Sequence, residues 1–291
     1  MINKKVIFSI FAGREKYLSI LKKYLDILIL KGLISEIHLW YFTTVDNDTK
    51  YLEKISNENE KYLLIKPIYS DYKSFDNDNR YKWDPYYKYY YENITDNTIL
   101  IKCDDDIIYI DIDRFEEFIN NIDDDVLYFP NIINNDVCAY FQQKIDIHNL
   151  FDYNINDNII YEIGHSYPLT DWYRSFDKAC QIHDLFLNDK DKFLLTNKDL
   201  INYGNRISIN FFACNNIAVK KIFLHFLEHG NGDDETYFGG EGSRYLSSMN
   251  KINKINPNFL VVHFQFGPQD GNKLDILYLD KYNELSDKYK I

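Results

Sequence analysis

The sequence predicts an α/β fold: one domain whose first part is built on parallel strands, within a central sheet that is mixed overall. Three observations favour it. Apolar residues alternate between strand-like and helix-like spacing through residues 4–68. A further strand at residues 99–103 is mostly apolar, which is typical of a strand buried on both faces. No Ser-, Gly- or Pro-rich linker divides the 291 residues, which suffice for one large α/β domain.

The first part of the chain predicts three strands separated by two helices. The strands lie at residues 4–11, 37–42 and 62–68. Apolar residues at helical spacing predict a helix over residues 15–33, and an acidic cap predicts another over residues 48–55. This order is that of a right-handed parallel, Rossmann-like unit, so we expect residues 1–130 to form a nucleotide-binding half.

The next segments are also regular. Pro85 suits the first turn of a Tyr-rich helix that ends near Asn93 and leads into the strand at residues 99–103. A capping-box pattern opens a helix over residues 113–122, and another strand follows at residues 126–130.

Residues 131–291 are less regular. Residues 131–163 mix short apolar runs with Asn and Asp, which favours irregular or antiparallel strands. Beyond them the spacing predicts, in order, a helix over 172–187, a strand over 207–214, a helix over 217–228, a strand over 259–266 and a helix from 274.

Three carboxylates, Asp104, Asp105 and Asp106, follow the buried strand directly. In an open α/β sheet, ligands bind outside the carboxyl ends of the strands. Carboxylates crowded into one turn repel each other unless a cation lies between them, so the pattern predicts a hard divalent ion that can bridge to phosphate. The alternative is a surface turn between two strands. Lys102, inside the same strand, needs an acidic partner, and the triplet offers one.

A second triplet, residues 123–125, serves as an internal comparison. It follows a helical pattern and precedes another strand, so we interpret it as a solvated turn.

Composition excludes several classes of protein. A hydrophobic content of 45% excludes disorder as the main state, and a net charge of −12 argues against a nucleic-acid partner. The four cysteines form no Cys-x-x-Cys pair, which favours free thiols in a reducing compartment. Since no apolar segment is long enough for a membrane span, we expect a soluble, cytoplasmic protein.

Taken together, the layout resembles the GT-A fold glycosyltransferases. The resemblance is carried by the parallel first half, the aspartate triplet after an aromatic helix, a later acidic loop and a late His. The segments Ala12-Gly-Arg-Glu15 and His38-Leu-Trp40, with the codon bias of an AT-rich genome, most resemble the glycosyltransferases of large DNA viruses, which would place the protein in a host cytoplasm. The resemblance implies transfer of a sugar from a nucleotide sugar, with UDP favoured, to a glycan or glycoprotein acceptor that residues 131–291 would bind.

The resemblance also implies a metal site for Mn²⁺ or Mg²⁺. Asp104 and Asp106 match the outer positions of the family's Asp-x-Asp motif. Asp106 is the better candidate for direct ligation, Asp104 for the donor ribose or a metal-bound water, and Asp105 for sharing either task. His263 matches a third ligand, although a core histidine bonded to the backbone is an equally good interpretation.

Two further sets of residues complete the prediction. In inverting members an acidic pair accepts the proton of the acceptor hydroxyl, which implies Asp234 as base, with Asp233 or Glu235 orienting the acceptor; helix capping is the alternative. Three basic residues would reach the uracil or the diphosphate, unless they are surface side chains: Arg14, Arg80 and Lys82.

Two other functions stay open at this point. A metal-dependent nucleotidyltransferase or phosphohydrolase would also need carboxylates and a cation. A non-catalytic glycan-binding module would use the acids to hold calcium and the aromatic residues to grip sugar.

Overall fold

The structure is a computed structural model. It describes residues 4–66, 83–123, 125–144, 175–194, 199–203, 207–229, 234, 237–238 and 251–289.

The predicted parallel half is confirmed. Strands β1 (Lys5–Ala12), β2 (Glu36–Tyr41) and β3 (Tyr62–Ile65) are separated by helices α1 (Glu15–Leu30) and α2 (Asp46–Glu58). β2 pairs parallel with both β1 and β3. The α1 residues that repeat at helical spacing are buried against the sheet, which is why this segment forms a helix with one apolar face.

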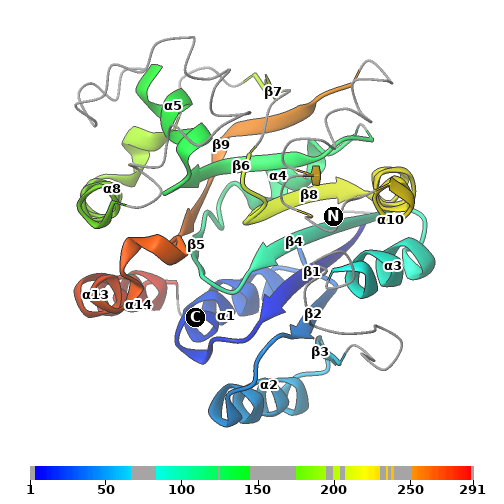
Figure 1. Cartoon of the computed structure of the whole chain (residues 1–291), viewed down its shortest axis with the longest axis horizontal. Coiled ribbons are helices and arrows are strands. Elements are labelled where there is room, and N and C mark those ends of the chain that lie inside the picture. Colours follow the sequence, from blue (N-terminus) through cyan, green and yellow to red (C-terminus); the bar gives the residue numbers. More distant parts are fainter. Residues whose placement is uncertain are drawn as a thin grey trace.

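The central sheet is mixed and Rossmann-like, as expected (Figure 1). Its nine strands, counted within the described residues, run in the order β3-β2-β1-β4-β8-β6-β9-β5, with β7 also paired to β9. β4 is parallel to β1, whereas β8 runs antiparallel to β4. The remaining strands are β4 (Thr98–Asp104), β5 (Ile107–Ile110), β6 (Tyr128–Ile133), β7 (Ile201–Tyr203), β8 (Phe211–Asn215) and β9 (Asn253–His263).

Helices lie along both sides of this sheet. In Figure 1, α3 and α10 lie to its right, and α8, α13 and α14 to its left. Tyr87 of α3 packs edge-on against Phe226 of α10, so aromatic contacts hold the right-hand pair together. The helices are α3 (Asp84–Asn93), α4 (Phe115–Asn120), α8 (Phe176–Asn188), α9 (Asn216–Ala218), α10 (Leu224–His229), α13 (Gly271–Leu274) and α14 (Asp280–Asp287), with the π-helical turns η4 (Val219–Phe223) and η7 (Asp275–Leu279).

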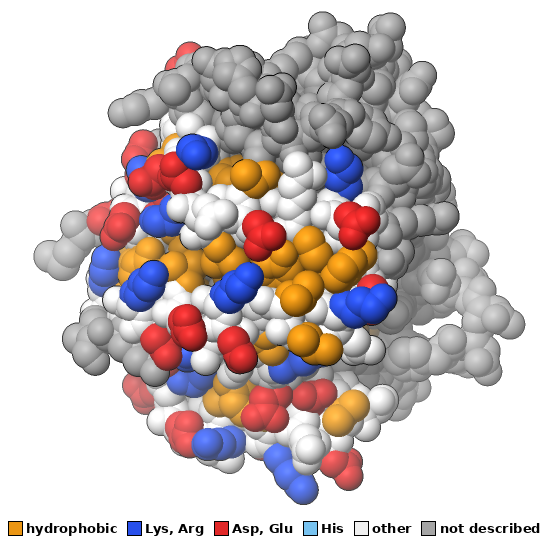
Figure 2. All heavy atoms as spheres, turned by 90° about the vertical axis from the view of Figure 1, so that its left-hand side faces the viewer, with side chains coloured by type: hydrophobic (Ala, Val, Ile, Leu, Met, Phe, Trp, Pro, Cys, Tyr) orange, Lys and Arg blue, Asp and Glu red, His pale blue; other side chains and the backbone are white. Residues whose placement is uncertain are grey.

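The chain's last helices close one face of the molecule. Lys16 and Lys23 of α1 form ion pairs with Asp275 and Asp287. Figure 2 shows the left-hand side of Figure 1, where acidic and basic side chains border a band of hydrophobic surface. In the parts of the chain that the structure describes, no helix has the length and apolar character needed to cross a membrane.

The prediction of irregular or antiparallel strands over residues 131–163 holds for residues 131–133, which end strand β6, and was wrong for residues 136–144. β6 ends at Ile133, Asn134 adopts a positive φ of 60°, and α5 (Asp136–Lys144) follows. Asn135 caps this helix, since its Oδ1 accepts a hydrogen bond from the Cys138 N–H at 3.1 Å. The sequence contains these turn and capping residues, Asn134 and Asn135. Asn is so frequent throughout the chain that its presence here did not indicate the start of a helix.

The second aspartate triplet is not simply solvated. Asp125 is only 9% exposed and forms ion pairs with Lys221 and Lys251. The Tyr128 hydroxyl donates to the carboxylate of Asp123 at 2.7 Å. Because both lysines come from distant segments of the chain, no local pattern could indicate that Asp125 is buried and paired.

Candidate metal centre

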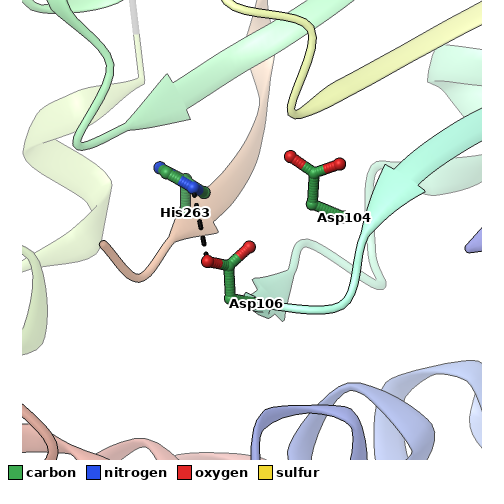
Figure 3. A group of neighbouring side chains, drawn as sticks. All are labelled: Asp104, Asp106 and His263. Carbon is green, nitrogen blue, oxygen red and sulfur yellow. Dashed lines mark ion pairs between the residues drawn. The ribbon is translucent and has the colours of Figure 1, made fainter. Parts of the chain in front are cut away.

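Three elements bring Asp104, Asp106 and His263 together (Figure 3). Asp104 ends β4, Asp106 lies in the turn to β5, and His263 ends β9. β5 and β9 pair antiparallel with Ile107 opposite His263, and the Phe264 N–H donates to the Asp106 carbonyl at 2.9 Å. The pairing of β5 with β9 thus brings Asp106 to the histidine, while the buried strand β4 brings Asp104 to the same point.

One potential ligand atom from each of these residues lies within 4.8 Å of the others. His263 Nε2 is 3.6 Å from Asp106 Oδ2. A divalent ion with bonds of about 2.0–2.2 Å holds its ligand atoms about 3–4.4 Å apart, so small side-chain shifts would close the group around a cation. Two carboxylates and an imidazole are ligands that divalent cations accept.

Burial makes this group unusual. Asp106 and His263 are each 3% exposed, and in the described part of the chain Asp106 Oδ1 and His263 Nδ1 have no hydrogen-bond partner. Buried polar atoms without partners are costly in free energy, so they point to a ligand. Burial alone would raise the pKa of Asp106, but His263 and Arg14 lower that pKa to about 2. The carboxylate is therefore held in its anionic form, which a cation requires.

Asp105 is turned away from this group and fixes the loop between β1 and α1. Its Oδ2 accepts the N–H groups of Gly13 and Arg14, both at 2.8 Å, and its Oδ1 accepts Arg14 Nε at 2.8 Å. A side chain at Gly13 would not fit, because its Cβ would lie 2.3 Å from the Phe42 carbonyl oxygen. Asp105 therefore supports the cluster through Arg14.

Arg14 links the acidic cluster to open space. Its Nη2 lies 3.1 Å from Asp106 Oδ2, and its side chain is 41% exposed. It also lines a pocket of about 510 Å³ together with Lys16, Asn47 and Asp48. Burial lowers the pKa of the guanidinium, but Asp106 and Asp105 together raise that pKa above its usual value, so Arg14 stays cationic at the pocket wall.

Lys102 has the acidic partner that its buried position predicted. Its Nζ donates to Asp104 Oδ1 at 2.5 Å and to the Ile209 carbonyl at 2.7 Å. Burial lowers the pKa of the ammonium, but Asp104 and then Asp234 outweigh burial and raise it. Asp234 is buried and accepts a hydrogen bond from the Tyr87 hydroxyl at 2.8 Å, so it lies near the same ammonium as Asp104.

Several predicted site residues cannot be placed. Asp233, Glu235, Arg80 and Lys82 lie outside the described residues.

One residue of the cluster was not predicted. Asn210 precedes β8, and its Nδ2 lies 3.1 Å from Asp104 Oδ2 and 3.3 Å from His263 Nε2. An amide interrupting the apolar run Ile209 to Phe212 was the available signal. It became meaningful only with the antiparallel pairing of β8 and β4, which places Asn210 beside Asp104.

Comparison with known proteins finds solved structures of similar fold but assigns the chain to no family. No protein-family model and no curated protein matches the chain. Among 29 solved chains that match is 4-diphosphocytidyl-2C-methyl-D-erythritol synthase from Anaerococcus prevotii, which is 10% identical with a TM-score of 0.47 over 97% of this chain and 99% of that one. At this TM-score the likeness supports no conclusion about activity. The resemblance to viral GT-A glycosyltransferases gains no support from these comparisons.

Proposed function

We propose that this protein is a divalent-cation-dependent transferase for a nucleotide-linked substrate, and that it moves a sugar from a nucleotide sugar to a hydroxyl of a glycan or glycoprotein. The supporting observation is the convergence of Asp104, Asp106 and His263, with buried polar atoms lacking partners, just beyond the carboxyl end of a parallel strand. UDP-sugars are the favoured donors, and Mn²⁺ or Mg²⁺ the favoured cations.

The cluster divides into ligands and supports in this proposal. Asp106 and His263 would hold the cation, with Asp104 as a third ligand or as a partner of the donor ribose. When bound there, a divalent cation would supply positive charge to the diphosphate leaving group. Arg14 adds a fixed positive charge at the pocket wall, where it would bind the same diphosphate.

Asp234 is our proposed base for an inverting reaction. A single displacement needs a carboxylate that accepts the acceptor proton as the new bond forms. Tyr87 fixes one Asp234 oxygen, and the pKa of Lys102 responds to Asp234 as well as to Asp104, which supports a position close to the metal cluster. Asp233 or Glu235 would orient the acceptor.

Nucleotidyl transfer is the second candidate. Two cationic side chains contact the acidic cluster, Arg14 at Asp106 and Lys102 at Asp104, and two cations beside the carboxylates would serve a nucleoside triphosphate as well as a nucleotide sugar. The two reactions differ in their products: sugar transfer or slow donor hydrolysis releases nucleoside diphosphate, whereas nucleotidyl transfer to a sugar phosphate releases pyrophosphate.

A product assay tests the proposal. The protein is incubated with Mn²⁺ and a panel of nucleotide sugars, and in parallel with nucleoside triphosphates and sugar 1-phosphates. We expect nucleoside diphosphate from one donor, lost with EDTA and in Asp106→Asn but retained in Asp123→Asn, a control in the second triplet. Pyrophosphate from the parallel reactions would instead establish nucleotidyl transfer. Glycan binding without either product would favour a non-catalytic module.

The stereochemistry is tested on the same product. Retention of the donor's anomeric configuration, seen by NMR, would rule out Asp234 as the base of a single displacement.

A further inference from the structure

Asn210 is an uncharged residue that contacts two members of the acidic cluster. Its Nδ2 contacts Asp104 Oδ2 at 3.1 Å and His263 Nε2 at 3.3 Å, and these are two of the three residues that could hold a cation. The residue is 9% exposed, and its Oδ1 has no hydrogen-bond partner among the described residues. A buried amide that uses its donor on the potential ligands therefore has its acceptor unsatisfied.

We infer that Asn210 is a fourth ligand of the cation at Asp104, Asp106 and His263, and that it binds through Oδ1 after its carboxamide turns over. The inference rests on the proposed function, because it assigns one more residue to the same site. The terminal torsion of Asn joins an sp³ to an sp² carbon and has a broad, roughly two-fold energy profile, so the torsion itself opposes the turn little. The turn breaks the contacts of Nδ2 with Asp104 and His263, and ligation of the cation would have to offset that loss. The amide oxygen and nitrogen are nearly alike in size, so Oδ1 can occupy the position that Nδ2 leaves.

The turn changes which amide atom faces the three potential ligands. Without a cation, Nδ2 offers hydrogens to Asp104 and His263, which holds the two side chains near each other. With a cation between the ligands, the positive edge of the amide would face a positive ion, whereas Oδ1 adds a neutral oxygen ligand. The four protein ligands would be two carboxylates, one amide and one imidazole, leaving two positions of an octahedral ion for diphosphate oxygens.

The alternative is that Asn210 acts only as a brace, which positions Asp104 and His263 through hydrogen bonds and does not bind the cation. Two substitutions distinguish these roles. Asn210→Ala removes both amide atoms. Asn210→Asp removes the donor hydrogens but keeps an oxygen at the ligand position. Ligation predicts that the aspartate variant binds the cation and the alanine variant binds it poorly, while a brace predicts that both lose affinity.

The measurement is Mn²⁺ binding to the whole protein without substrate, from the free Mn²⁺ signal in electron paramagnetic resonance. We expect Asn210→Ala to weaken affinity about 10-fold or more. We expect Asn210→Asp to bind Mn²⁺ at least as tightly as the native protein, and its melting temperature to gain at least as much from Mn²⁺. Asn131→Ala is the matched control: Asn131 is also buried and donates to the Phe193 and Pro257 carbonyls, so its loss should lower stability and leave Mn²⁺ affinity unchanged.

Three results would overturn the inference, of which the first two leave the proposed function standing, and a fourth result would reject the proposed function alone. Native affinity in Asn210→Ala, or an equal loss in Asn210→Asp, rejects Asn210 as a ligand while the metal site stands. Absence of Mn²⁺ binding in the native protein rejects the metal site as a whole. Mn²⁺ binding that depends on Asn210 as expected, in a protein that converts no nucleotide substrate, supports the ligand and rejects the transferase.

Discussion

Replacement of Lys102 by Met tests whether the ammonium of this lysine neutralises the carboxylate of Asp104 in the acidic cluster. The Lys102 side chain is 3% exposed and pairs with Asp104, whose side chain is 24% exposed. Breaking a buried ion pair costs about 3–5 kcal/mol, and partial exposure of Asp104 with its remaining bond to Asn210 favours the lower end, about 3 kcal/mol. Met fills most of the vacated volume, so little of this loss comes from a cavity.

The assay is urea unfolding at neutral pH, read as the free energy of unfolding, with thermal unfolding beside it. At about 2–4 °C per kcal/mol for a large domain, a 3 kcal/mol loss corresponds to a melting temperature lower by about 6–12 °C. Lys88→Met is the matched control: Lys88 forms an exposed pair with Glu92, so its replacement should cost less than about 1 kcal/mol.

A double-mutant cycle decides whether the pairing is the cause. Removing the charge of Asp104 as well, in Lys102→Met with Asp104→Asn, should restore part of the lost stability because no unpaired carboxylate remains. Mn²⁺ should also raise the melting temperature of Lys102→Met more than that of the native protein, since the cation replaces the missing positive charge. A loss below 1 kcal/mol, or a double variant as unstable as the sum of the two single ones, would refute the reasoning.

Three other expectations follow from the geometry. Asp106→Asn should abolish cation-dependent turnover and lower Mn²⁺ affinity at least 10-fold while the circular dichroism spectrum stays native; activity near the native level would contradict the proposed site. Burial lowers the pKa of His183 to about 4, so the unfolded chain takes up this proton first as pH falls. The contribution of His183 to stability is complete above pH 6.5 and falls by about 3 kcal/mol toward pH 4, and an unfolding series across that range should have a shallower slope in His183→Asn. Gly13→Ala should lower the free energy of unfolding by about 1–3 kcal/mol, because its Cβ meets the Phe42 carbonyl, and a native value in urea unfolding would show that the loop adapts.

The parallel half was predictable because its signals are local. Apolar spacing in α1 and the apolar strands β1 and β2 each lie within one segment, and right-handed connection rules then fix their arrangement. β9 was harder: it begins at Asn253 rather than Phe259, since its polar first residues pair with β6 and β7. Only the partner strands show that these polar residues belong to the sheet.

In the candidate site, too, some residues could be predicted from local sequence and others only from strand pairing. Asp104 and Asp106 could be found from one triplet after one strand, and Lys102 from its need for a nearby acid. Asn210 could not, because its role depends on β8 running antiparallel beside β4, a pairing between residues about a hundred positions apart. The catalytic role of Asp234 stays a prediction. The division of the chain into two functional halves at residue 130 also stays a prediction.

The proposed function would require an acidic protein to bind a phosphate-bearing substrate. The overall net charge is −12, which would repel a diphosphate at long range. At the cluster, the three carboxylates of the triplet face two fixed cations: Arg14 contacts Asp105 and Asp106, and Lys102 contacts Asp104. One negative charge of the triplet is therefore unmatched, and Asp234 adds another near Lys102. A site with this balance would attract a nucleotide only after a divalent cation has bound, because the fixed side chains alone leave it negative.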